Sequence, residues 1–472
     1  MTRDPIWAIA ENIIRSQYED LPQDAIEGSK KGILDAFGAT IAGSTAPGVD
    51  QVLKLLNTWG GRKESTIAMF GQKLPSYHAV LANVMMCHAL EIDDSHFPSI
   101  VHATGPTLWA GIAAAEKYNG VVSGKDLLSA IVVGIDAMAR IGLAAPNTID
   151  NGYTAGAVFA GFGAAATAGK LLKLDTNEMV HALGINFSRA TATVQTAKDG
   201  ALMKRLQPAF NASAGIKAVE FSKAGITGVQ NVLEGQFGIG RLLNHAPIDR
   251  ERLLDRIGRY YLSSELTTKR YPTSRCSHAP IEGTLALVRQ HNITPDDVAE
   301  VIVYVQKSCY VRESEPFDPN EGSAQVKAQF CIDYTVAAAI LWRDVFIEQI
   351  QDKAIFDPRI LNLTRKIKIV EYIEKIGPTQ YLPARITIRT HDGKNYTTEV
   401  TQLRGSPEDP LSWDEIITER VERCVAFSVY PVSKRRVLSL VEMCRNLDEM
   451  SDVRELMRAM VFRRPSISTA SN

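Results

Sequence analysis

Apolar and small side chains recur at helical spacing through most of the first half of the chain. The runs with this pattern are Asp24–Gly43, Ser76–Ile92, Thr104–Tyr118, Lys125–Ala144, Ala155–Leu172 and Pro208–Lys223. Alanine, leucine, methionine and other small residues dominate them, a composition that favours helices. Only Thr66–Phe70 has an extended pattern there. This part of the sequence therefore predicts a compact helical domain.

The pattern changes after Tyr271-Pro272. Val298–Val305 has the dense β-branched content of a strand, and Ala384–Val400 alternates around His391-Asp-Gly-Lys-Asn, which predicts a hairpin. Ile367–Tyr372 is expected to add a further strand, and Ala328–Trp342 a buried helix. These elements together predict a smaller α+β unit.

The chain returns to a helical pattern after this unit. We therefore predict a mainly α fold, in which a large all-helical domain is formed by both chain ends and a smaller α+β lid domain is inserted into it. The expected boundaries are 1–268 and 406–461 for the two parts of the helical domain, 269–405 for the lid domain and 462–472 for a flexible tail.

Composition and charge narrow the possible partners. The chain has 472 residues, 45% of them hydrophobic, and its 52 basic side chains nearly balance its 53 acidic ones. No overall electrostatic field attracts nucleic acid or an anionic membrane, so neither is an expected partner.

The start of the chain lacks a signal-like apolar run and its end lacks a peroxisomal tripeptide, so we expect a cytoplasmic protein.

The six cysteines are far apart in the sequence and form no CxxC spacing. This argues against a zinc ribbon and gives no support to an iron–sulfur cluster. We expect reduced, mostly buried thiols.

One short stretch carries most of the candidate chemistry. Between Glu91 and Pro106 lie Asp93, Asp94, His96 and His102, in a turn-prone segment between two helical runs. Aspartate and histidine fill cores poorly and are well suited to moving protons near neutral pH. The stretch therefore indicates an enzyme.

Three segments place a histidine or lysine near an expected helix start. Thr104-Gly-Pro106 follows His102, Pro280 follows His278, and Pro208 follows Lys204. Helix N-termini offer N–H donors and partial positive charge to anions. Each residue alone has an ordinary structural explanation, as a turn aspartate, a loop histidine or a solvated lysine. Their joint occurrence points to a small polycarboxylate ligand.

Two other chemistries are disfavoured. Asp93, Asp94, His96 and His102 could in principle bind a metal, but their spacing matches no tight metal motif. Gly161-Phe-Gly163-Ala-Ala-Ala166 imitates a dinucleotide fingerprint, yet it lies in a helical run that no strand precedes. We expect neither a metal nor an organic cofactor.

Three blocks of the sequence resemble the 2-methylcitrate dehydratase (MmgE/PrpD) family, which includes cis-aconitate decarboxylase and iminodisuccinate epimerase. They are His88-Ala-Leu-Glu-Ile-Asp-Asp94 followed by His102, Gly200-Ala-Leu-Met-Lys-Arg-Leu-Gln-Pro-Ala-Phe-Asn-Ala-Ser-Ala-Gly215, and Lys269-Arg-Tyr-Pro-Thr-Ser-Arg-Cys-Ser-His278. The resemblance covers nearly the whole chain. It implies a helical domain with an inserted lid domain, usually a homodimer, and a substrate cleft between the domains.

The resemblance also implies the site residues. Asp93, His102, Lys204 and His278 match positions that line the active site of decarboxylase-like members. Further substrate contacts are expected from Asp94, His96, Tyr153, Thr154 and Arg205. Decarboxylase-like members place a histidine where this chain has Thr154, or Tyr153 in a shifted register. Gln207-Pro208 also departs from the His-Ala or His-Gly of many relatives.

We therefore expect a cofactor-independent lyase that dehydrates a 2-alkylcitrate such as 2-methylcitrate. Lys204 and His278 would hold substrate carboxylates, His102 would be the principal acid or base, and Asp93 would orient it. The alternatives are decarboxylation of cis-aconitate to itaconate, epimerisation of an imino- or amino-dicarboxylate, and a catalytically silent binding or scaffold member. The missing histidine disfavours the decarboxylase.

Overall fold

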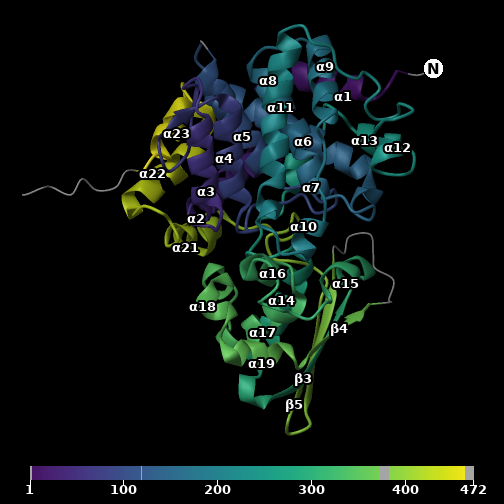
Figure 1. Cartoon of the computed structure of the whole chain (residues 1–472), viewed down its shortest axis with the longest axis vertical. Helices are drawn as coiled ribbons and strands as arrows, with labels where there is room; N and C mark the ends of the chain where they lie inside the picture. The colour runs from purple at the N-terminus through teal and green to yellow at the C-terminus, as the bar shows by residue number, and fades with distance from the viewer. Residues whose placement is uncertain (1–2, 119, 373–381, 463–472) are drawn as a thin grey trace, which may run out of the picture.

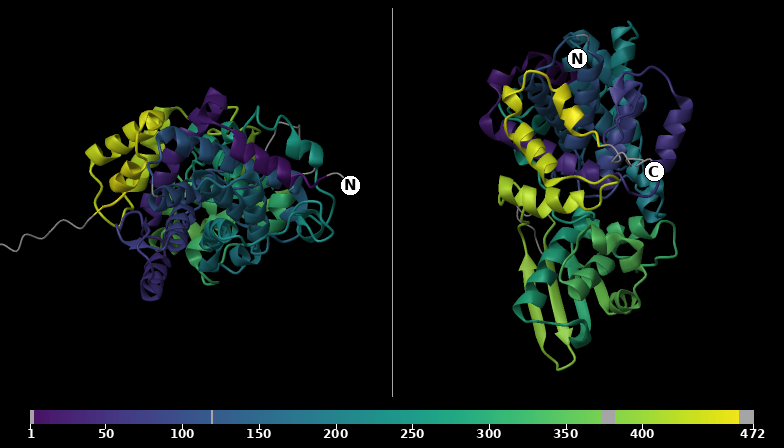
Figure 2. Two further views of the ribbon diagram at one scale, coloured as in Figure 1. Left: turned by 90° about the horizontal axis from the view of Figure 1, so that it is seen from above. Right: turned by 90° about the vertical axis from the view of Figure 1, so that its left-hand side faces the viewer.

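The computed structural model describes residues 3–118, 120–372 and 382–462. It has two parts, an upper body of helices and a lower body in which helices pack against a sheet (Figure 1). Helices from the beginning and from the end of the chain lie together in the upper body, and the middle of the chain forms the lower body. Figure 2 shows the same division from two further directions.

The upper body is built mainly from the first half of the chain. Its helices are α1 (Ile6–Arg15), α2 (Gln23–Gly43), α3 (Val49–Trp59), α4 (Ser76–His88), α5 (Thr104–Lys117), α6 (Gly124–Ala144), α7 (Ala155–Val158), α8 (Ala160–Leu171), α9 (Thr176–Phe187), α10 (Gln195–Lys198), α11 (Gln207–Lys223), α12 (Ile239–Leu242) and α13 (Arg250–Leu254). The expected strand at Thr66–Phe70 is mostly wrong, because only β1 (Ser65–Thr66) is a strand there, paired antiparallel with β2 (Lys73–Leu74).

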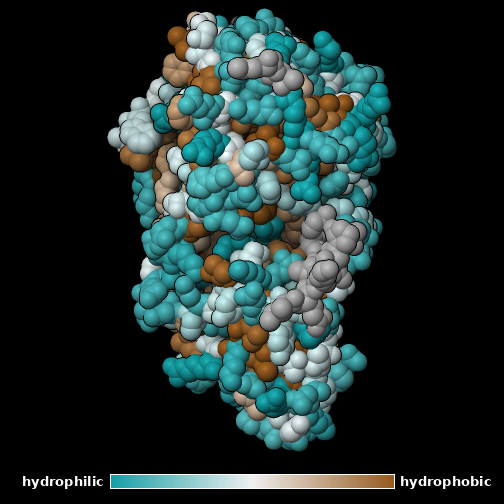
Figure 3. Space-filling model, turned by 90° about the vertical axis from the view of Figure 1, so that its right-hand side faces the viewer, coloured by the Kyte–Doolittle hydropathy of each residue, from teal (hydrophilic) through white to brown (hydrophobic). Residues whose placement is uncertain are grey.

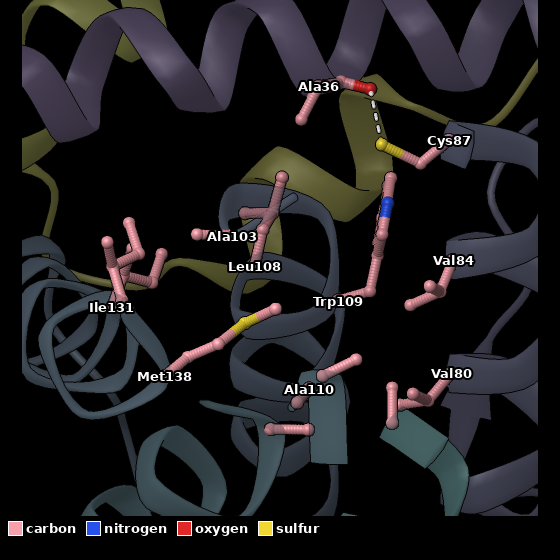
Figure 4. Packing of buried hydrophobic residues seen from close by; sticks show 14 of the residues in the cluster. Ala36, Val80, Val84, Cys87, Ala103, Leu108, Trp109, Ala110, Ile131 and Met138 are labelled. Atoms are coloured by element: carbon pink, nitrogen blue, oxygen red, sulfur yellow. Dashed lines mark hydrogen bonds between the residues drawn. The ribbon is translucent and has the colours of Figure 1, made fainter. Parts of the chain in front are cut away.

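Small residues let these helices approach closely. A Cβ added to Gly215 of α11 would lie 2.4 Å from the carbonyl oxygen of Gly161 in α8, so any larger residue there would push the two helices apart. The Gly161–Ala166 segment is thus part of a buried packing helix. In Figure 4 the fully buried Trp109 lies among side chains of α4 and α6, such as Val84 and Met138. Dense packing of this kind fixes the helix positions.

The end of the chain completes the upper body. Its elements are α20 (Trp413–Glu415), a π-helical segment (Ile416–Val421), α21 (Glu422–Val425), α22 (Lys434–Arg445) and α23 (Arg454–Ala459). Their buried side chains belong to the same hydrophobic cluster as those of α1 to α13. The prediction of a helical domain formed by both chain ends is therefore confirmed. Phe462 is buried in this cluster, and the rest of the expected tail lies outside the described residues.

The lower body holds a four-stranded sheet. Its strands are β3 (Val298–Val305), β4 (Ile367–Glu371), β5 (Ala384–Thr390) and β6 (Asn395–Val400), in the order β4-β3-β5-β6. β4 is parallel to β3, and the other pairs are antiparallel. Its helices are α14 (His278–Gln290), α15 (Lys307–Glu313), α16 (Ala324–Gln329), α17 (Ile332–Trp342), α18 (Asp352–Ile355) and α19 (Pro358–Thr364). The predicted α+β unit, its hairpin and the strand at Val298–Val305 are confirmed.

One further expectation changes. Cys276 and Cys309 form a disulfide, so they are not the reduced thiols that the sequence suggested, whereas the other four cysteines are free and buried.

Of the described helices, α6 alone is long and apolar enough to match a membrane span, but 94% of its apolar window is buried inside the protein. A helix enclosed in this way is explained by core packing. The face in Figure 3 is mostly hydrophilic, with hydrophobic side chains in small separate groups.

Candidate active site

A cavity of about 400 Å³ lies where the two bodies meet. The upper body contributes His88, Glu91, His102, Thr154, Lys198 and Lys204 to its wall. The segment after α13 and the lower body contribute Lys269, Ser274, Arg275, Cys276, Arg312, Glu313, Phe317, Lys327 and Phe330. A ligand in this cavity would contact both bodies.

The loop from α4 to α5 brings the acid–base residues to this cavity. Helix α4 ends at His88, four residues earlier than the pattern predicted, because the chain turns at Glu91, a non-glycine residue with a φ of +53°. Asp94 then accepts hydrogen bonds from the backbone N–H and the hydroxyl of Thr104. These bonds fix the start of α5 against the loop, as N-terminal caps do. His102 is thereby held next to His88.

Asp93 joins the two histidines. Its Oδ2 lies 2.9 Å from Nδ1 of His88 and 3.3 Å from Nδ1 of His102. The imidazole rings meet edge to face, with centroids 4.7 Å apart. Although burial opposes it, the two imidazoles hold the pKa of Asp93 well below its usual range, so Asp93 is a carboxylate; it hydrogen-bonds to Nδ1 of His88, and the ring of His102 lies beside it. Nε2 of His88, on the other side of the ring, lies against the amine of Lys204.

Both histidines are neutral near neutral pH. Burial lowers the pKa of His102 to about 4, with Asp93 opposing the shift and the nearby His88 adding to it. Burial and the charge of Lys204 likewise lower the pKa of His88 to about 4. The side chain of His102 is 19% exposed and reaches the cavity, whereas that of His88 is 5% exposed. His102 is therefore the imidazole best placed to act as a base on a ligand.

Two lysines converge on Glu91. Lys204 Nζ contacts Glu91 Oε1 directly and lies 2.8 Å from Nε2 of His88. Lys269 Nζ lies 3.3 Å from the other oxygen, Oε2 of Glu91. Burial, together with Lys269 and Arg205, lowers the pKa of Lys204, while contact with a carboxylate favours its charged form. Burial also lowers the pKa of Lys269 to about 8. The result is a buried pair of lysine amines that share one internal carboxylate.

Sequence reasoning missed His88, Glu91 and Lys269 as site residues. All three stand in the blocks that carry the family resemblance. His88 begins the first block, Glu91 lies within it, and Lys269 begins the third block. Glu91 and Lys269 are 178 positions apart, and only the fold brings them together. Their position in these blocks is the sequence feature by which they could have been recognised as site residues.

Thr154 lies on the cavity wall just before α7. A Cβ added to Gly156, two residues later, would be 3.2 Å from Cδ2 of His102, so this segment packs directly against the loop that carries His102. Tyr153 is absent from the cavity wall and pairs through its backbone with Thr193. Of the two expected registers, the structure thus favours Thr154 as the residue facing a ligand.

His278 is placed differently from the expectation. It is the first residue of α14 and is 2% exposed, with its ring 5.3 Å from that of Tyr271 and 6.3 Å from that of Phe97. Burial and the charge of Lys269 hold its pKa well below the usual range. It does not line the cavity, so a direct contact with a substrate carboxylate finds no support in this arrangement.

Three other expected contacts also lie away from the cavity wall. Asp94 is buried against Thr104. His96 has Nδ1 2.7 Å from the Ser99 hydroxyl and Nε2 3.2 Å from Glu265. Arg205 donates to the carbonyl of Pro47 and to Gln325. All three side chains support the surrounding structure, and this placement does not favour substrate binding by them.

His88, Glu91 and His102 could supply a metal with three ligand atoms, all within 4.8 Å of one another. The donor types suit zinc or iron. However, the Lys204 amine contacts Glu91 and lies against His88, at the place where these ligands converge. A divalent ion there would meet this nitrogen, charged or neutral, between two of its ligands. The residues present therefore fit an ion pair better than a metal site.

Comparison with known protein families and sequences identifies relatives of this chain. The MmgE/PrpD N-terminal domain matches residues 8–250, and the MmgE/PrpD C-terminal domain matches residues 271–447. The cis-aconitate decarboxylase-like protein oryM of Aspergillus oryzae is 26% identical over 93% of each chain. Cis-aconitate decarboxylase of Aspergillus terreus is 26% identical over 94% of this chain and 93% of its own, and that of Mus musculus is 24% identical over 93% and 90%. With both domain models matched in order along the sequence, this chain belongs to the MmgE/PrpD family.

Proposed function

We propose that this protein is a cofactor-independent lyase that dehydrates a small hydroxy-tricarboxylate of the 2-alkylcitrate type, such as 2-methylcitrate. The observation that carries the proposal is the neutral His102 imidazole, held by the Asp93 carboxylate beside the buried amines of Lys204 and Lys269. This arrangement unites a base with cations at one end of an enclosed cavity.

The charges around the cavity suit a polycarboxylate. The cations on its wall are Lys198, Lys204, Lys269, Arg275, Arg312 and Lys327. Two of them, Lys204 and Lys269, are buried, where an interaction with an anion is screened little by water. Charge-assisted hydrogen bonds from lysine and arginine are also the strongest that a carboxylate receives. A ligand with several carboxylates would therefore bind at this junction.

The reaction would begin at the His102–Asp93 pair. Nε2 of His102 takes a proton from the carbon next to a substrate carboxylate, and Asp93 stabilises the imidazolium that forms. The negative charge that develops on the substrate is stabilised by Lys204 and Lys269, an effect worth several kcal/mol in a preorganised site. Loss of the neighbouring hydroxyl as water completes the dehydration.

Decarboxylation of cis-aconitate to itaconate is the second candidate. It is favoured by the similarity to cis-aconitate decarboxylases over more than nine-tenths of the chain. Against it stands Thr154, because a threonine hydroxyl is not a useful general acid or base near neutral pH, and the family resemblance implies an imidazole at this place on the cavity wall. We therefore rank dehydration first.

The test is to incubate the purified protein with 2-methylcitrate, cis-aconitate and iminodisuccinate, with and without a chelator, and to follow the products by NMR. Formation of 2-methylaconitate supports dehydration, and itaconate supports the second candidate. Interconversion of iminodisuccinate enantiomers would indicate an epimerase. Turnover of none of the three would favour a silent binding member, and loss of activity with chelator alone would contradict a metal-free reaction.

We also propose that the protein is a cytoplasmic homodimer. Light scattering tests the oligomeric state, and cell fractionation tests the location.

A further inference from the structure

Glu313 is a cavity carboxyl with no part in the steps above. It is the last residue of α15 in the lower body and is 5% exposed. The hydroxyl of Ser274 lies 2.6 Å from each of its oxygens. Ser274 is fixed in turn, because its hydroxyl accepts from the backbone N–H of Cys276 and its own N–H donates to the carbonyl of Gln329. The carboxyl is therefore held in one place on the wall.

No ion pair joins Glu313 to a lysine or arginine within the described parts of the chain. The nearby cations are directed elsewhere: Arg275 donates to the carbonyl of Phe97, Arg312 to Sγ of Cys276, and Lys269 to Glu91. A buried carboxyl without a cation in contact is costly to ionise. Burial accordingly raises the pKa of Glu313 to about 7, although Ser274 and the charges of Arg312, Arg275 and Lys269 oppose the shift.

Other carboxylates on the cavity wall differ from Glu313. Glu315 lies 2.9 Å from Lys198 and its side chain is 71% exposed, and Glu321 lies 2.9 Å from Lys327 with 65% exposed. Among these three, Glu313 alone combines burial with the absence of a cationic partner.

We propose that Glu313 is the general acid that protonates the leaving hydroxyl, while His102, from the upper body, removes the proton. This inference rests on the proposed dehydration and deepens it. The electron pair of the broken C–H bond becomes the new C=C bond as the C–O bond breaks. The Glu313 proton joins the departing oxygen to form water. Glu313 is left as a carboxylate and His102 as an imidazolium, and exchange with solvent returns both to their starting states.

The roles of acid and base follow from the environments of Glu313 and His102. Burial lowers the pKa of His102 to about 4 and raises that of Glu313 to about 7, so between these two values a neutral base and a protonated acid coexist. Enzymes often separate acid and base roles in this way, through environments that move two pKa values in opposite directions. The two groups are also supplied by different bodies, so they can face a ligand from two sides.

The test uses Glu313→Gln with two substrates, 2-methylcitrate and its analogue with fluorine in place of the hydroxyl. Fluoride leaves without a proton, so it does not need the acid. We expect Glu313→Gln to lower kcat for dehydration by about 100-fold or more, and to leave fluoride release within about threefold of the wild type. Glu348→Gln, at an exposed glutamate away from the cavity wall, is the matched control and should change neither reaction. Glu313→Asp should recover part of the dehydration.

The outcomes separate this inference from the proposed function. If the wild type acts on neither substrate, the proposed function fails and the role of Glu313 fails with it. If the wild type is active and Glu313→Gln dehydrates normally, only the Glu313 assignment is overturned. If both reactions fall equally in Glu313→Gln, the residue supports the structure or the first step, which also overturns the assignment. Only selective loss of dehydration supports a proton donor.

Discussion

Asp35 of α2 and Arg420 of the π-helical segment form a fully buried ion pair between the two ends of the chain, with 2.6 Å between Oδ1 and a guanidinium nitrogen. Arg420 also donates to the carbonyl of Ile92, the residue before Asp93. The last helices of the chain are thus connected directly to the loop that carries the acid–base residues. Loss of this contact would affect both stability and the site.

We expect Arg420→Leu to lower the free energy of unfolding by about 3–5 kcal/mol, because it leaves the Asp35 carboxylate buried without a partner. Urea unfolding followed by tryptophan fluorescence measures this change. The double variant Asp35→Leu with Arg420→Leu should recover much of the loss, since it removes both charges. Arg359→Ala, which breaks an exposed pair with Asp357, is the control and should leave the midpoint unchanged. A single variant as stable as the wild type would contradict this account.

Much of the fold follows from local sequence patterns. The strand at Val298–Val305 has the predicted bounds, because its buried positions alternate with partly exposed ones from Glu300 to Val305. The helix at Ser76–His88 was predicted to continue to Ile92, since Ala89 and Leu90 are good helix formers. Its end depends on the turn at Glu91, which is stabilised by contacts with Lys204 and Lys269 from distant parts of the chain. Local propensity contains no information about those contacts.

Part of the site also follows from local sequence patterns, and part does not. His102, Asp93 and Lys204 lie together as expected, because each stands next to the start or end of a helix that the pattern located. The partner of Cys276 and the burial of Glu313 could not be found in this way. Cys276 and Cys309 are separated by 33 positions, and Ser274 and Glu313 by 39. Such pairs depend on how α14 and α15 pack, which neither periodicity nor spacing reveals.

His102→Ala and Lys204→Ala should each reduce kcat by about 10²-fold or more, since one removes the base and the other a cation that stabilises the developing charge. Steady-state kinetics with the substrate identified above provides the measurement, and circular dichroism verifies the fold. His391→Ala, in an exposed turn of the lower body, serves as the matched histidine control. Near-normal turnover in either site variant would remove that residue from the mechanism.

Asp94 predicts a pH dependence of stability. Burial raises its pKa to about 8, so the folded protein keeps this carboxyl protonated where an unfolded chain would release the proton. The unfolded state therefore binds fewer protons between about pH 4 and pH 8, and the contribution of Asp94 to stability is lost as the pH rises through that range. Relative to the wild type, Asp94→Asn should become progressively more stable from pH 4 to pH 8.

Urea unfolding of both proteins at several pH values tests this expectation, and only the difference between them is used, because other buried groups also titrate. A constant difference for Asp94→Asn would mean that the carboxyl ionises in the folded protein as it does in the unfolded chain.

The last prediction concerns the choice between dehydration and decarboxylation. Thr154→His restores an imidazole at the cavity wall, in the segment that packs against His102 through Gly156. We expect it to raise the rate of itaconate formation from cis-aconitate by at least about tenfold, because a second imidazole can protonate the carbanion left by carbon dioxide. The side chain also fills part of the cavity, so KM for 2-methylcitrate should rise. Thr154→Asn, which adds bulk without a titrating group, separates the two effects: the KM change should appear in both variants and the gain in itaconate only in Thr154→His. Equal itaconate formation by the two variants would show that Thr154 does not determine the reaction.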